Sequence, residues 1–566
     1  MTSERAAGFG FAATARRSVA RLTACALAAL VVLAGASASR AQGGFAQDPV
    51  LFVHGIEGSG AQFESQKMRF MSNGYPSAWV DAVDYDSTRA VVDRSEVNSQ
   101  IDQAIAALKD ATGHSTVNVV GHSLGTSVMY DYLTEGSGAA ERRANVGKYV
   151  NVDGQSSNPG VPTLAVWAGR GSPGRNMDGA TNVTIPNQTH VQVATSAESF
   201  VEYHKFLTGE APDHDIVPET DQITIAGRAL LFPQNKGLPL VVTLEIWPVA
   251  TDTGQRTSGS PVASIPLPAS GNFGPVAVET GQRYEFVLHR PSIGTLHYYY
   301  EPFVRSDHLI RLLYADAIEA LVQRSENHVA GLVLRYKELW GDQPGENDVL
   351  SLNGTNVCVE AICPISKQVN ALFFYDRGLD GKTDLSSPDP VFSALPFITG
   401  ADIFLPAARP PTGTVTASLK SRGGGPVRSL NFPNFPSTTD GAVLLFNDFE
   451  HVDEVPLPGH CDGGILGDDD PNVLTGTLGP DKIRGLGGAD EIRGRTGRDC
   501  LAGDAGDDEI HGGGDPDELW GGDGDDEFFA VRGGHDVIHC GPGDDRVHAG
   551  RNDVVGASCE RVTRGS

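Results

Sequence analysis

The sequence predicts an α/β domain, two β-rich domains and a C-terminal parallel β-roll. Between residues 48 and 220, short apolar strands alternate with helical stretches such as 97–108, a pattern typical of a mostly parallel sheet covered by helices. From about residue 222, apolar runs separated by Gly, Pro and Ser favour antiparallel strands. After residue 461, a nine-residue repeat rich in Gly and Asp indicates a solenoid of short strands.

The length of the chain also predicts several domains, because 566 residues exceed what one hydrophobic core supports. We expect an α/β domain at 48–220, a β-sandwich or barrel at 221–320, a second β-rich domain at 321–456 and the repeats at 461–566. A helical break at 307–323 is expected between the two β-rich domains. The net charge of −28 argues against nucleic-acid binding, and its accumulation after residue 461 indicates a specialised tail.

Residues 1–41 are predicted to form a signal peptide. Arg16, Arg17 and Arg21 precede the apolar stretch 22–34, and the sequence Ser39-Arg40-Ala41 offers a small-x-small cleavage site. The apolar stretch is too short to span a bilayer comfortably. We therefore expect a secreted mature chain without a transmembrane segment.

Six cysteines remain after removal of a signal peptide, an even number that favours disulfides in an exported chain. Cys358 and Cys363 could close a tight turn. The pairing of the four tail cysteines cannot be deduced from spacing, although Cys540 with Cys559 is the pair we favour among Cys461, Cys500, Cys540 and Cys559.

The pentapeptide Gly121-His122-Ser123-Leu124-Gly125 lies between an apolar run and a helix-like segment. In the α/β-hydrolases this order of strand, sharp turn and helix exposes a serine hydroxyl above the edge of the sheet, and the glycines let the turn close. Ser123 is therefore the candidate nucleophile.

An upstream apolar run, residues 50–56, is predicted to be a buried strand that ends in a His54-Gly55 turn. In this fold the residue after such a turn and the residue after the nucleophile donate backbone N–H groups to the oxyanion. We expect Ile56 and Leu124 to form the oxyanion hole.

His190 is the candidate base, because it follows a short β-branched strand at 181–185 and stands after Ser123 in the chain. Asp153, at the end of a predicted strand at 148–152, is favoured as the acid over Asp178, which an ordinary turn explains. Three other histidines are not placed after the last strand of the domain: His54, His122 and His204.

The tail contains three phased columns, of Gly, Asp and apolar residues, with a period of nine. We expect alternate aspartates to line opposite edges of the roll and to bind ions there. The later units drift, because Asp536 and Asp545 stand one residue beyond the phase. The six candidate metal ligands are Asp481, Asp490, Asp499, Asp508, Asp517 and Asp526.

Several further stretches resemble bacterial and archaeal lipases of the α/β-hydrolase fold, above all an archaeal long-chain type with C-terminal β-domains. The resemblance implies a carboxylic ester hydrolase for acylglycerols or similar long-chain esters, with Ser123, Asp153 and His190 as its triad and β-domains that help to accommodate acyl chains. The tail resembles the calcium-binding nonapeptide repeats of exported RTX proteins, which implies structural calcium and no cofactor for the chemistry. The matching stretches include residues 53–65, 68–70, 73–76, 189–192, 214–218, 356–364 and 374–378.

One departure from the lipases is the short segment of about fifteen residues between the strand near Asp84 and the helix near Ile101, which puts a large lid in doubt. The same machinery would also serve a polyester depolymerase or an acyltransferase. A third possibility is a calcium-dependent surface or adhesion protein with a vestigial hydrolase domain. The oligomeric state and the acyl chain preference are not predicted.

Overall fold

The computed structural model describes residues 46–91, 93–170, 174–219, 222–238, 242–290, 294–422, 426–449, 464–468, 470–531, 536–551, 553–556 and 558–565. The predicted signal peptide, residues 1–41, lies outside the described residues. Within the described ranges, none of the helices combines the length and the apolar character needed to cross a bilayer.

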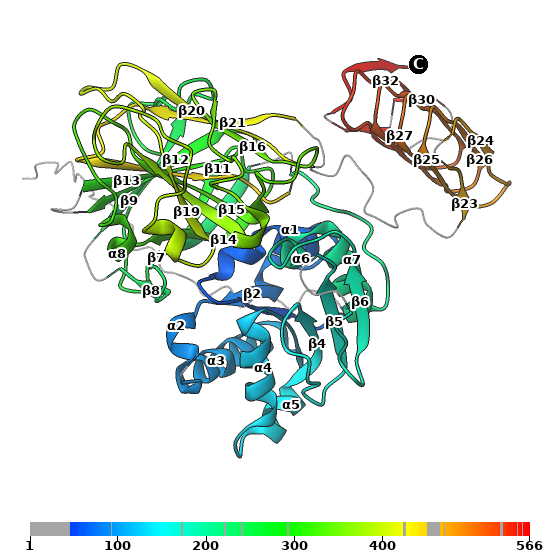
Figure 1. The fold of residues 1–566 in the computed structure, drawn as a ribbon. Coiled ribbons are helices and arrows are strands. Elements are labelled where there is room, and N and C mark those ends of the chain that lie inside the picture. Colours follow the sequence, from blue (N-terminus) through cyan, green and yellow to red (C-terminus); the bar gives the residue numbers. More distant parts are fainter. Residues whose placement is uncertain are drawn as a thin grey trace, which may run out of the picture. The chain divides into compact units, whose positions relative to one another are not determined.

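The first domain is built on a parallel six-stranded sheet with the strand order β2-β1-β3-β4-β5-β6 (Figure 1). Three of its six strands, β1, β3 and β5, are buried throughout, as expected for a sheet covered on both faces. The strands are β1 (Val50–Val53), β2 (Val80–Val83), β3 (Val117–His122), β4 (Val146–Val152), β5 (Thr163–Ala168) and β6 (Thr181–Ile185).

Helices cover both faces of this sheet. On one face, α3 buries apolar residues at helical spacing and ends at Gly113, in the left-handed conformation. On the other face, Phe70 of α1 packs edge-on against Phe200 of α7, with ring centroids 5.0 Å apart. The helices are α1 (Glu64–Ser72), α2 (Ser87–Ala90), α3 (Ser95–Thr112), α4 (Leu124–Thr134), α5 (Ala139–Asn145), α6 (Gln192–Thr195) and α7 (Ala197–Thr208).

The β-rich region is organised around an eight-stranded sheet with the order β10-β9-β12-β13-β22-β15-β18-β19. β22 lies between β13 and β15 and is parallel to both, so the segments 221–320 and 321–456 share this sheet. Its strands are β9 (Thr243–Val249), β10 (Ala263–Pro266), β12 (Arg283–Arg290), β13 (Gly294–Tyr300), β15 (Gly331–Leu339), β18 (Val369–Tyr375), β19 (Ile398–Asp402) and β22 (Asp440–Leu445).

Two smaller sheets complete the β-rich region. The first joins β11 (Asn272–Val278), β7 (Ile223–Leu231) and β14 (Asp307–Tyr314), with β8 (Lys236–Gly237) paired to β7. The second has the order β17-β16-β20-β21 and consists of β16 (Val349–Leu352), β17 (Thr355–Asn356), β20 (Thr414–Lys420) and β21 (Arg428–Pro433).

The helical break expected at 307–323 is wrong over its first half. Residues Asp307–Tyr314 form β14, parallel to β7, and a short helix, α8 (Asp316–Glu319), follows. β14 is buried on both of its faces, so its apolar residues do not alternate, and a helix and a doubly buried strand have similar patterns over such a length.

Buried ion pairs join the first domain to the β-rich region. Asp84, which follows β2, accepts hydrogen bonds from Arg311 Nε (2.9 and 3.1 Å) and Arg228 Nη1 (2.8 Å). Burial opposes the charge of Asp84, but the two guanidiniums outweigh it and lower the pKa of this carboxyl. Removing either partner would leave a buried charge uncompensated, so these pairs fix the contact between the two regions.

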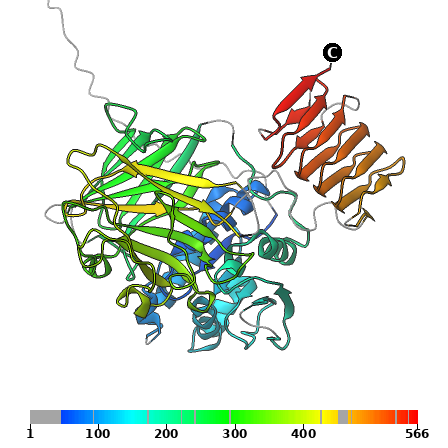
Figure 2. The same ribbon diagram turned by 45° about the horizontal axis from the view of Figure 1, so that its top comes forward.

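The tail is a parallel β-roll, as expected (Figure 2). Successive strands alternate between two six-stranded sheets, and neighbours within a sheet are mostly eighteen residues apart, as in the pairing of Ile483 with Leu501. The strands are β23 (Ile465–Leu466), β24 (Val473–Thr475), β25 (Lys482–Gly487), β26 (Glu491–Thr496), β27 (Cys500–Ala505), β28 (Glu509–Gly514), β29 (Glu518–Asp523), β30 (Glu527–Ala530), β31 (Val537–His539), β32 (Arg546–Ala549), β33 (Val554–Val555) and β34 (Arg561–Arg564).

The phased apolar column forms the core of the roll. All six of its predicted members are fully buried and pack together, with Ile538 and Val547 extending the cluster: Ile483, Ile492, Leu501, Ile510, Leu519 and Phe528.

Cys540 and Cys559 form a disulfide in the tail, with Cα atoms 5.3 Å apart. Cys358 and Cys363, in contrast, are buried free thiols, so the suggested staple of that turn is not formed.

Candidate active site and calcium-binding repeats

Ser123 occupies a sharp turn between β3 and α4. Its backbone angles, φ 53° and ψ −120°, are strained for a residue with a side chain. Gly125 is required there, because a Cβ at this position would lie 2.2 Å from the carbonyl oxygen of Val53. The close approach of the turn to β1 therefore fixes the serine at the carboxyl edge of the sheet.

The structure brings Ser123, His190 and Asp153 together. His190 Nε2 lies 2.8 Å from Ser123 Oγ, and His190 Nδ1 donates to Asp153 Oδ2 at 2.7 Å. Asp153 follows β4, and its side chain is 2% exposed. Asp178, the alternative acid, is exposed and accepts from Asn176 instead.

His122 has a structural part in this site that its place inside the turn did not reveal. Gln62 Nε2 donates to His122 Nδ1 (2.8 Å), and His122 Nε2 donates to the carbonyl of His190 (2.8 Å). Burial and the neighbouring His190 lower the pKa of His122 to about 3. A neutral His122 thus supports the backbone of His190, and the pairing of an elbow residue with a distant loop leaves no signal in the sequence.

His54 orients the peptide that precedes Ile56. Its Nδ1 donates to the carbonyl of Gly55 (2.7 Å), while its Nε2 accepts from the N–H of Tyr85 (3.3 Å). Burial lowers the pKa of His54 to about 4, so the ring is neutral. Because C=O and N–H point in opposite directions across a trans peptide, this bond turns the N–H of Ile56 away from His54.

Leu124 is the first residue of α4, where backbone N–H groups have no acceptor within the helix. A Cβ on Gly55 would lie 3.0 Å from Ser123 Cβ, so the loop that carries Ile56 runs directly past the serine. The two predicted oxyanion donors therefore lie on segments that flank Ser123.

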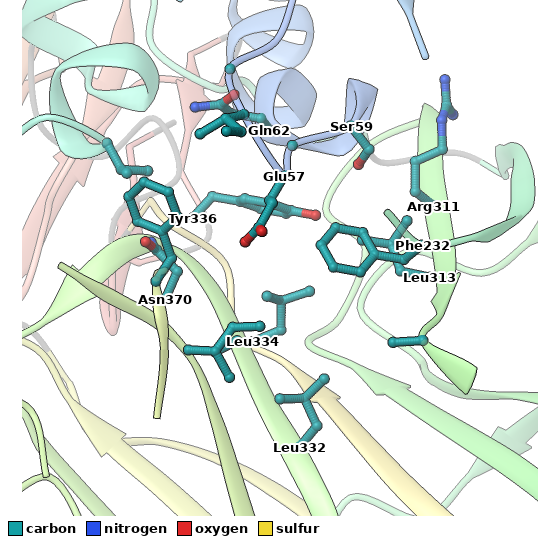
Figure 3. A pocket seen from close by; sticks show the side chains of 18 of the residues that line it. Glu57, Ser59, Gln62, Phe232, Arg311, Leu313, Leu332, Leu334, Tyr336 and Asn370 are labelled. Atoms are coloured by element: carbon teal, nitrogen blue, oxygen red, sulfur yellow. The ribbon is translucent and has the colours of Figure 1, made fainter. Parts of the chain in front are cut away.

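An apolar pocket begins at Ser123 and His190 and extends to the β-rich region. Its far wall is the inner side of the eight-stranded sheet together with β14. Figure 3 shows side chains from both regions facing this space. The apolar residues of the far wall include Leu313, Leu332, Leu334, Phe373, Val443 and Leu445.

Glu57 is a charged residue in this otherwise largely apolar lining. It follows Ile56, has a φ of 52°, and its carboxyl group points into the pocket (Figure 3). Burial raises the pKa of Glu57, and Lys367 only partly offsets this effect. No sequence pattern distinguishes this residue, since an acidic residue in a loop is ordinarily solvated.

In the tail, the aspartates form two ladders, which are rows of hydrogen bonds from the backbone N–H of one aspartate to the carboxylate of the aspartate one coil later. On one edge, the N–H groups of Asp481 and Asp499 donate to Asp499 and Asp517 at 2.9 and 3.0 Å. On the other edge, the N–H groups of Asp490 and Asp508 donate to the carboxylates of Asp508 and Asp526 at 2.8 and 2.9 Å. The structure therefore places alternate aspartates on opposite edges of the roll, as predicted.

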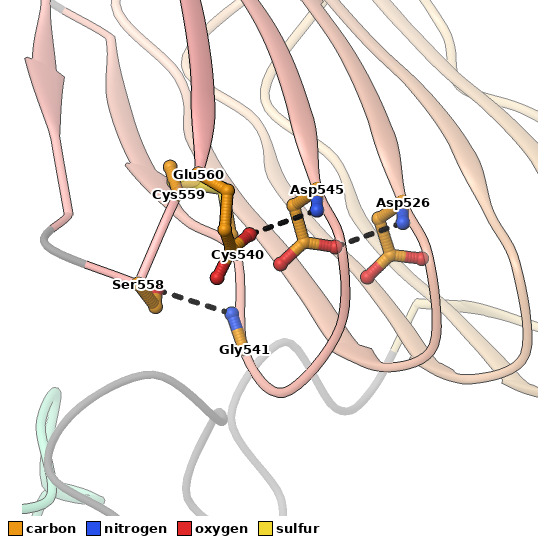
Figure 4. The surroundings of a disulfide bond; sticks show 7 residues. All are labelled: Asp526, Cys540, Gly541, Asp545, Ser558, Cys559 and Glu560. Carbon is orange, nitrogen blue, oxygen red and sulfur yellow. Dashed lines mark hydrogen bonds between the residues drawn. A yellow bond between two sulfur atoms is a disulfide. The ribbon is translucent and has the colours of Figure 1, made fainter.

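Both ladders continue past the point where the sequence phase slips. Asp517 N–H donates to Asp536 (2.9 Å), Asp526 N–H to Asp545 (2.8 Å), and Asp545 N–H to Glu560 (2.9 Å; Figure 4). A single extra residue between Asp526 and Asp536 shifts Asp536 and Asp545 out of phase, although each still stands two residues before a buried apolar residue, Ile538 or Val547.

The arrangement of these carboxylates is suited to binding a cation. In six of them Oδ1 accepts in the ladder and the buried Oδ2 has no protein partner among the described residues: Asp490, Asp499, Asp508, Asp517, Asp526 and Asp545. The predicted ligand Asp481 differs, because its carboxylate accepts from the N–H and the hydroxyl of Thr477. Burial and neighbouring carboxylates raise the pKa of Asp508 and Asp517 to about 7 and that of Asp526 to about 8. Rows of carboxylate and backbone oxygens in glycine turns are ligands suited to Ca²⁺, which would balance this charge.

The parallel sheet with a strained serine between a strand and a helix defines an α/β-hydrolase. Comparisons with known families agree: a class 2 lipase model matches residues 47–158, and a lipase C-terminal-domain model matches residues 221–317. A further C-terminal-domain model matches residues 317–450, and RTX calcium-binding nonapeptide repeats match 466–500, 502–533 and 530–553. Residues 47–158 and 221–317 are thus similar to lipases, and the tail is similar to calcium-binding repeats.

Among solved structures, the chain is similar to lipase B of Aspergillus fumigatus, with 13% identity and a TM-score of 0.24 over 29% of this chain and 53% of that one. The match therefore spans about half the length of that lipase. Bacillus licheniformis lipase BlEst2 in its propeptide form is similar at 11% identity and a TM-score of 0.23, over 69% of this chain and 94% of that one. No curated protein matches the chain in sequence.

Proposed function

We propose that the protein is a secreted hydrolase of acylglycerols or similar long-chain acyl esters, with Ser123 as nucleophile, His190 as base and Asp153 as acid. The observation that carries this proposal is the continuous set of hydrogen bonds from Ser123 Oγ to His190 to Asp153 at the mouth of an apolar pocket. Lipase family models over residues 47–158, which include Ser123 and Asp153, and over residues 221–317 support it.

In the proposed first step, His190 Nε2 takes the proton of Ser123 Oγ while the oxygen attacks the ester carbonyl. The backbone N–H groups of Ile56 and Leu124 hold the oxyanion, and Asp153 stabilises the imidazolium. His190 then protonates the leaving alcohol. Water, activated by the same histidine, releases the fatty acid from Ser123 in the second step.

The pocket is suited to the acyl group. Burial of one methylene from water contributes about 0.8 kcal/mol, so a long chain laid along this wall gains substantial binding energy. Strands β13, β14, β15, β18 and β22 supply that wall, so the β-rich region is proposed to bind the acyl chain of the substrate.

We also propose that the tail binds structural Ca²⁺ after export. Extracellular calcium modules bind at about 10⁻⁴ to 10⁻³ M, a range suited to a secreted chain. The orphaned Oδ2 atoms of the ladder aspartates support calcium, and the disulfide between Cys540 and Cys559 supports an oxidising compartment.

The proposal is tested by labelling the purified chain with a fluorophosphonate and by assaying p-nitrophenyl esters of increasing chain length, followed by triglyceride emulsions. We expect stoichiometric labelling at Ser123 and rising kcat/KM with chain length. Ser123→Ala should lose both labelling and turnover, with a wild-type circular dichroism spectrum. Turnover above about one part in a thousand in that variant contradicts the assignment of the nucleophile.

A further inference from the structure

The carboxylate of Glu338 binds the loop that carries His190, although it belongs to the β-rich region. Glu338 lies near the end of β15 and is fully buried. Its two oxygens accept from the N–H of Val191 (2.7 Å), the N–H of Gln192 (3.1 Å) and the hydroxyl of Thr189. These three donors flank His190 on both sides.

The donors are groups that the loop cannot satisfy by itself. Val191 is the N-cap of α6, and Gln192 is its first residue, so their N–H groups have no acceptor within this four-residue helix. A carboxylate at a helix N-terminus normally comes from a neighbouring residue, such as the N-cap itself. Here it comes from a strand about 150 positions further along the chain.

Glu338 is itself held in place. Arg422 Nη1 donates to the Glu338 carbonyl and to Asp348 Oδ2 (2.5 Å), and its guanidinium lies 3.7 Å from the ring centroid of Trp340. Arg422 also donates to the side chain of Gln192 (3.1 Å). The carboxylate is therefore presented by a rigid, buried network rather than by a mobile side chain.

We propose that Glu338 is a positioning residue for His190, so that the β-rich region sets the geometry of proton transfer as well as the acyl pocket. This inference rests on the proposed role of His190. The carboxylate fixes the chain on either side of the histidine, while His122 fixes its carbonyl. Together they hold the imidazole between Ser123 and Asp153, where a displacement of about 1 Å can cost about a hundredfold in rate.

The test is Glu338→Gln in the full chain, with Asp389→Asn as a matched control. The amide keeps the size of the side chain, but its NH₂ group cannot accept from an N–H. Asp389 is also buried in the β-rich region, and it too accepts from two backbone N–H groups, of Val391 (2.8 Å) and Phe392 (3.2 Å), and from the hydroxyl of Tyr375 (2.7 Å). It does not contact the His190 loop.

We expect Glu338→Gln to lower kcat, normalised to active sites titrated with a fluorophosphonate, by about thirty- to a hundredfold. The loss should be equal for short and long p-nitrophenyl esters, with KM changed by less than about twofold, because the acyl pocket is intact. Asp389→Asn should keep its normalised kcat within about twofold of wild type, even if its Tm falls.

An unchanged normalised kcat in Glu338→Gln, or a loss confined to KM for long esters, overturns the inference. If this variant does not fold, Thr189→Val removes one donor only and should still lower kcat by about three- to tenfold at constant KM. An unchanged kcat in Thr189→Val then overturns it. Failure of the proposed function would look different, because the wild-type chain itself would then lack Ser123 labelling.

Discussion

Asp153 is held by more than its bond to His190. Its Oδ1 accepts from the N–H of Ala168 (3.2 Å) and lies 3.7 Å from Arg175 Nη1, and its φ is 43°. Arg175 in turn lies over the ring of Trp167. The orientation of the carboxylate is therefore set by the ends of two strands, so a replacement of similar shape should stay in place.

This predicts a clear difference between two Asp→Asn variants. Asp153→Asn should lower kcat by about four orders of magnitude, because the amide favours the wrong tautomer of His190. Asp178→Asn, at an exposed turn, should change kcat by less than about twofold. Steady-state kinetics on a soluble ester measure both, and the reverse ranking would transfer the role of the acid to Asp178.

Glu57 predicts a pH dependence of acyl binding. Because burial raises its pKa, this carboxyl is neutral over a wider pH range than usual, and it ionises as the pH rises through the raised value. An acyl chain that covers the carboxyl disfavours the charged form further. KM for a long ester should therefore rise with pH, by at most about tenfold per pH unit, whereas KM for a short ester should not.

Glu57→Gln supplies the control, because it cannot ionise. Its ratio of long-ester to short-ester KM should be the same at every pH from 4.5, the ordinary pKa of a glutamate, to 9. A wild-type ratio that is equally flat would show that Glu57 does not contact the acyl chain.

At this scale, chain order and local motifs predicted which residues the structure brings together at Ser123. They could not predict Glu338, because a glutamate in the run Arg335-Tyr336-Lys337-Glu338 reads as a solvated residue on a strand. Its partners are distant in sequence, and a single chain carries no signal for such a pair.

Among the elements, the turn after β3 has little room for change. Gly125→Ala should unfold the protein or lower its stability by at least about 3 kcal/mol, because the new methyl group would overlap the carbonyl oxygens of Val53 and His54. Gly259→Ala is the matched control, since no atom lies within 4 Å of the added Cβ. Thermal unfolding followed by circular dichroism compares the two, and equal Tm values would mean that β1 can move away from the turn.

The elements of the first domain are predictable because each has its own local pattern. β3, α4 and β6 follow apolar runs or helical spacing with clear boundaries. β14 is not predictable in this way, since it is buried on both faces. Local patterns also cannot predict the position of β22 in the sheet, because its neighbours β13 and β15 precede it by about 100 residues or more.

For the whole molecule, the ladders predict separate behaviour of the tail and the active site. Without Ca²⁺ the buried carboxylates repel, and the apolar column is too thin to offset this cost and that of ordering many glycines. Chelation of the full chain should therefore remove β-signal and expose the tail to limited proteolysis, with recovery by about 10 mM Ca²⁺. Activity on a soluble ester should remain, because the proposed triad lies outside the tail.

A single variant makes the calcium test specific. Asp508→Asn removes the charge from a ladder position and should raise the Ca²⁺ concentration needed for folding of the tail, whereas Asp252→Asn, on an exposed turn, should not. A chelator that leaves the proteolysis pattern unchanged would contradict a calcium-dependent roll.

The central place of β22 in the eight-stranded sheet also fixes when the enzyme becomes complete. Ser123 is made early, but Val443 and Leu445, which line the pocket, leave the ribosome more than 300 residues later. At roughly 5–20 residues per second, synthesis of that interval takes tens of seconds. Until then β13 and β15 have no strand between them, so a nascent chain that already carries Ser123 has an unfinished pocket. The order of synthesis thereby delays the proposed hydrolysis of lipids until nearly all of the chain before the tail exists.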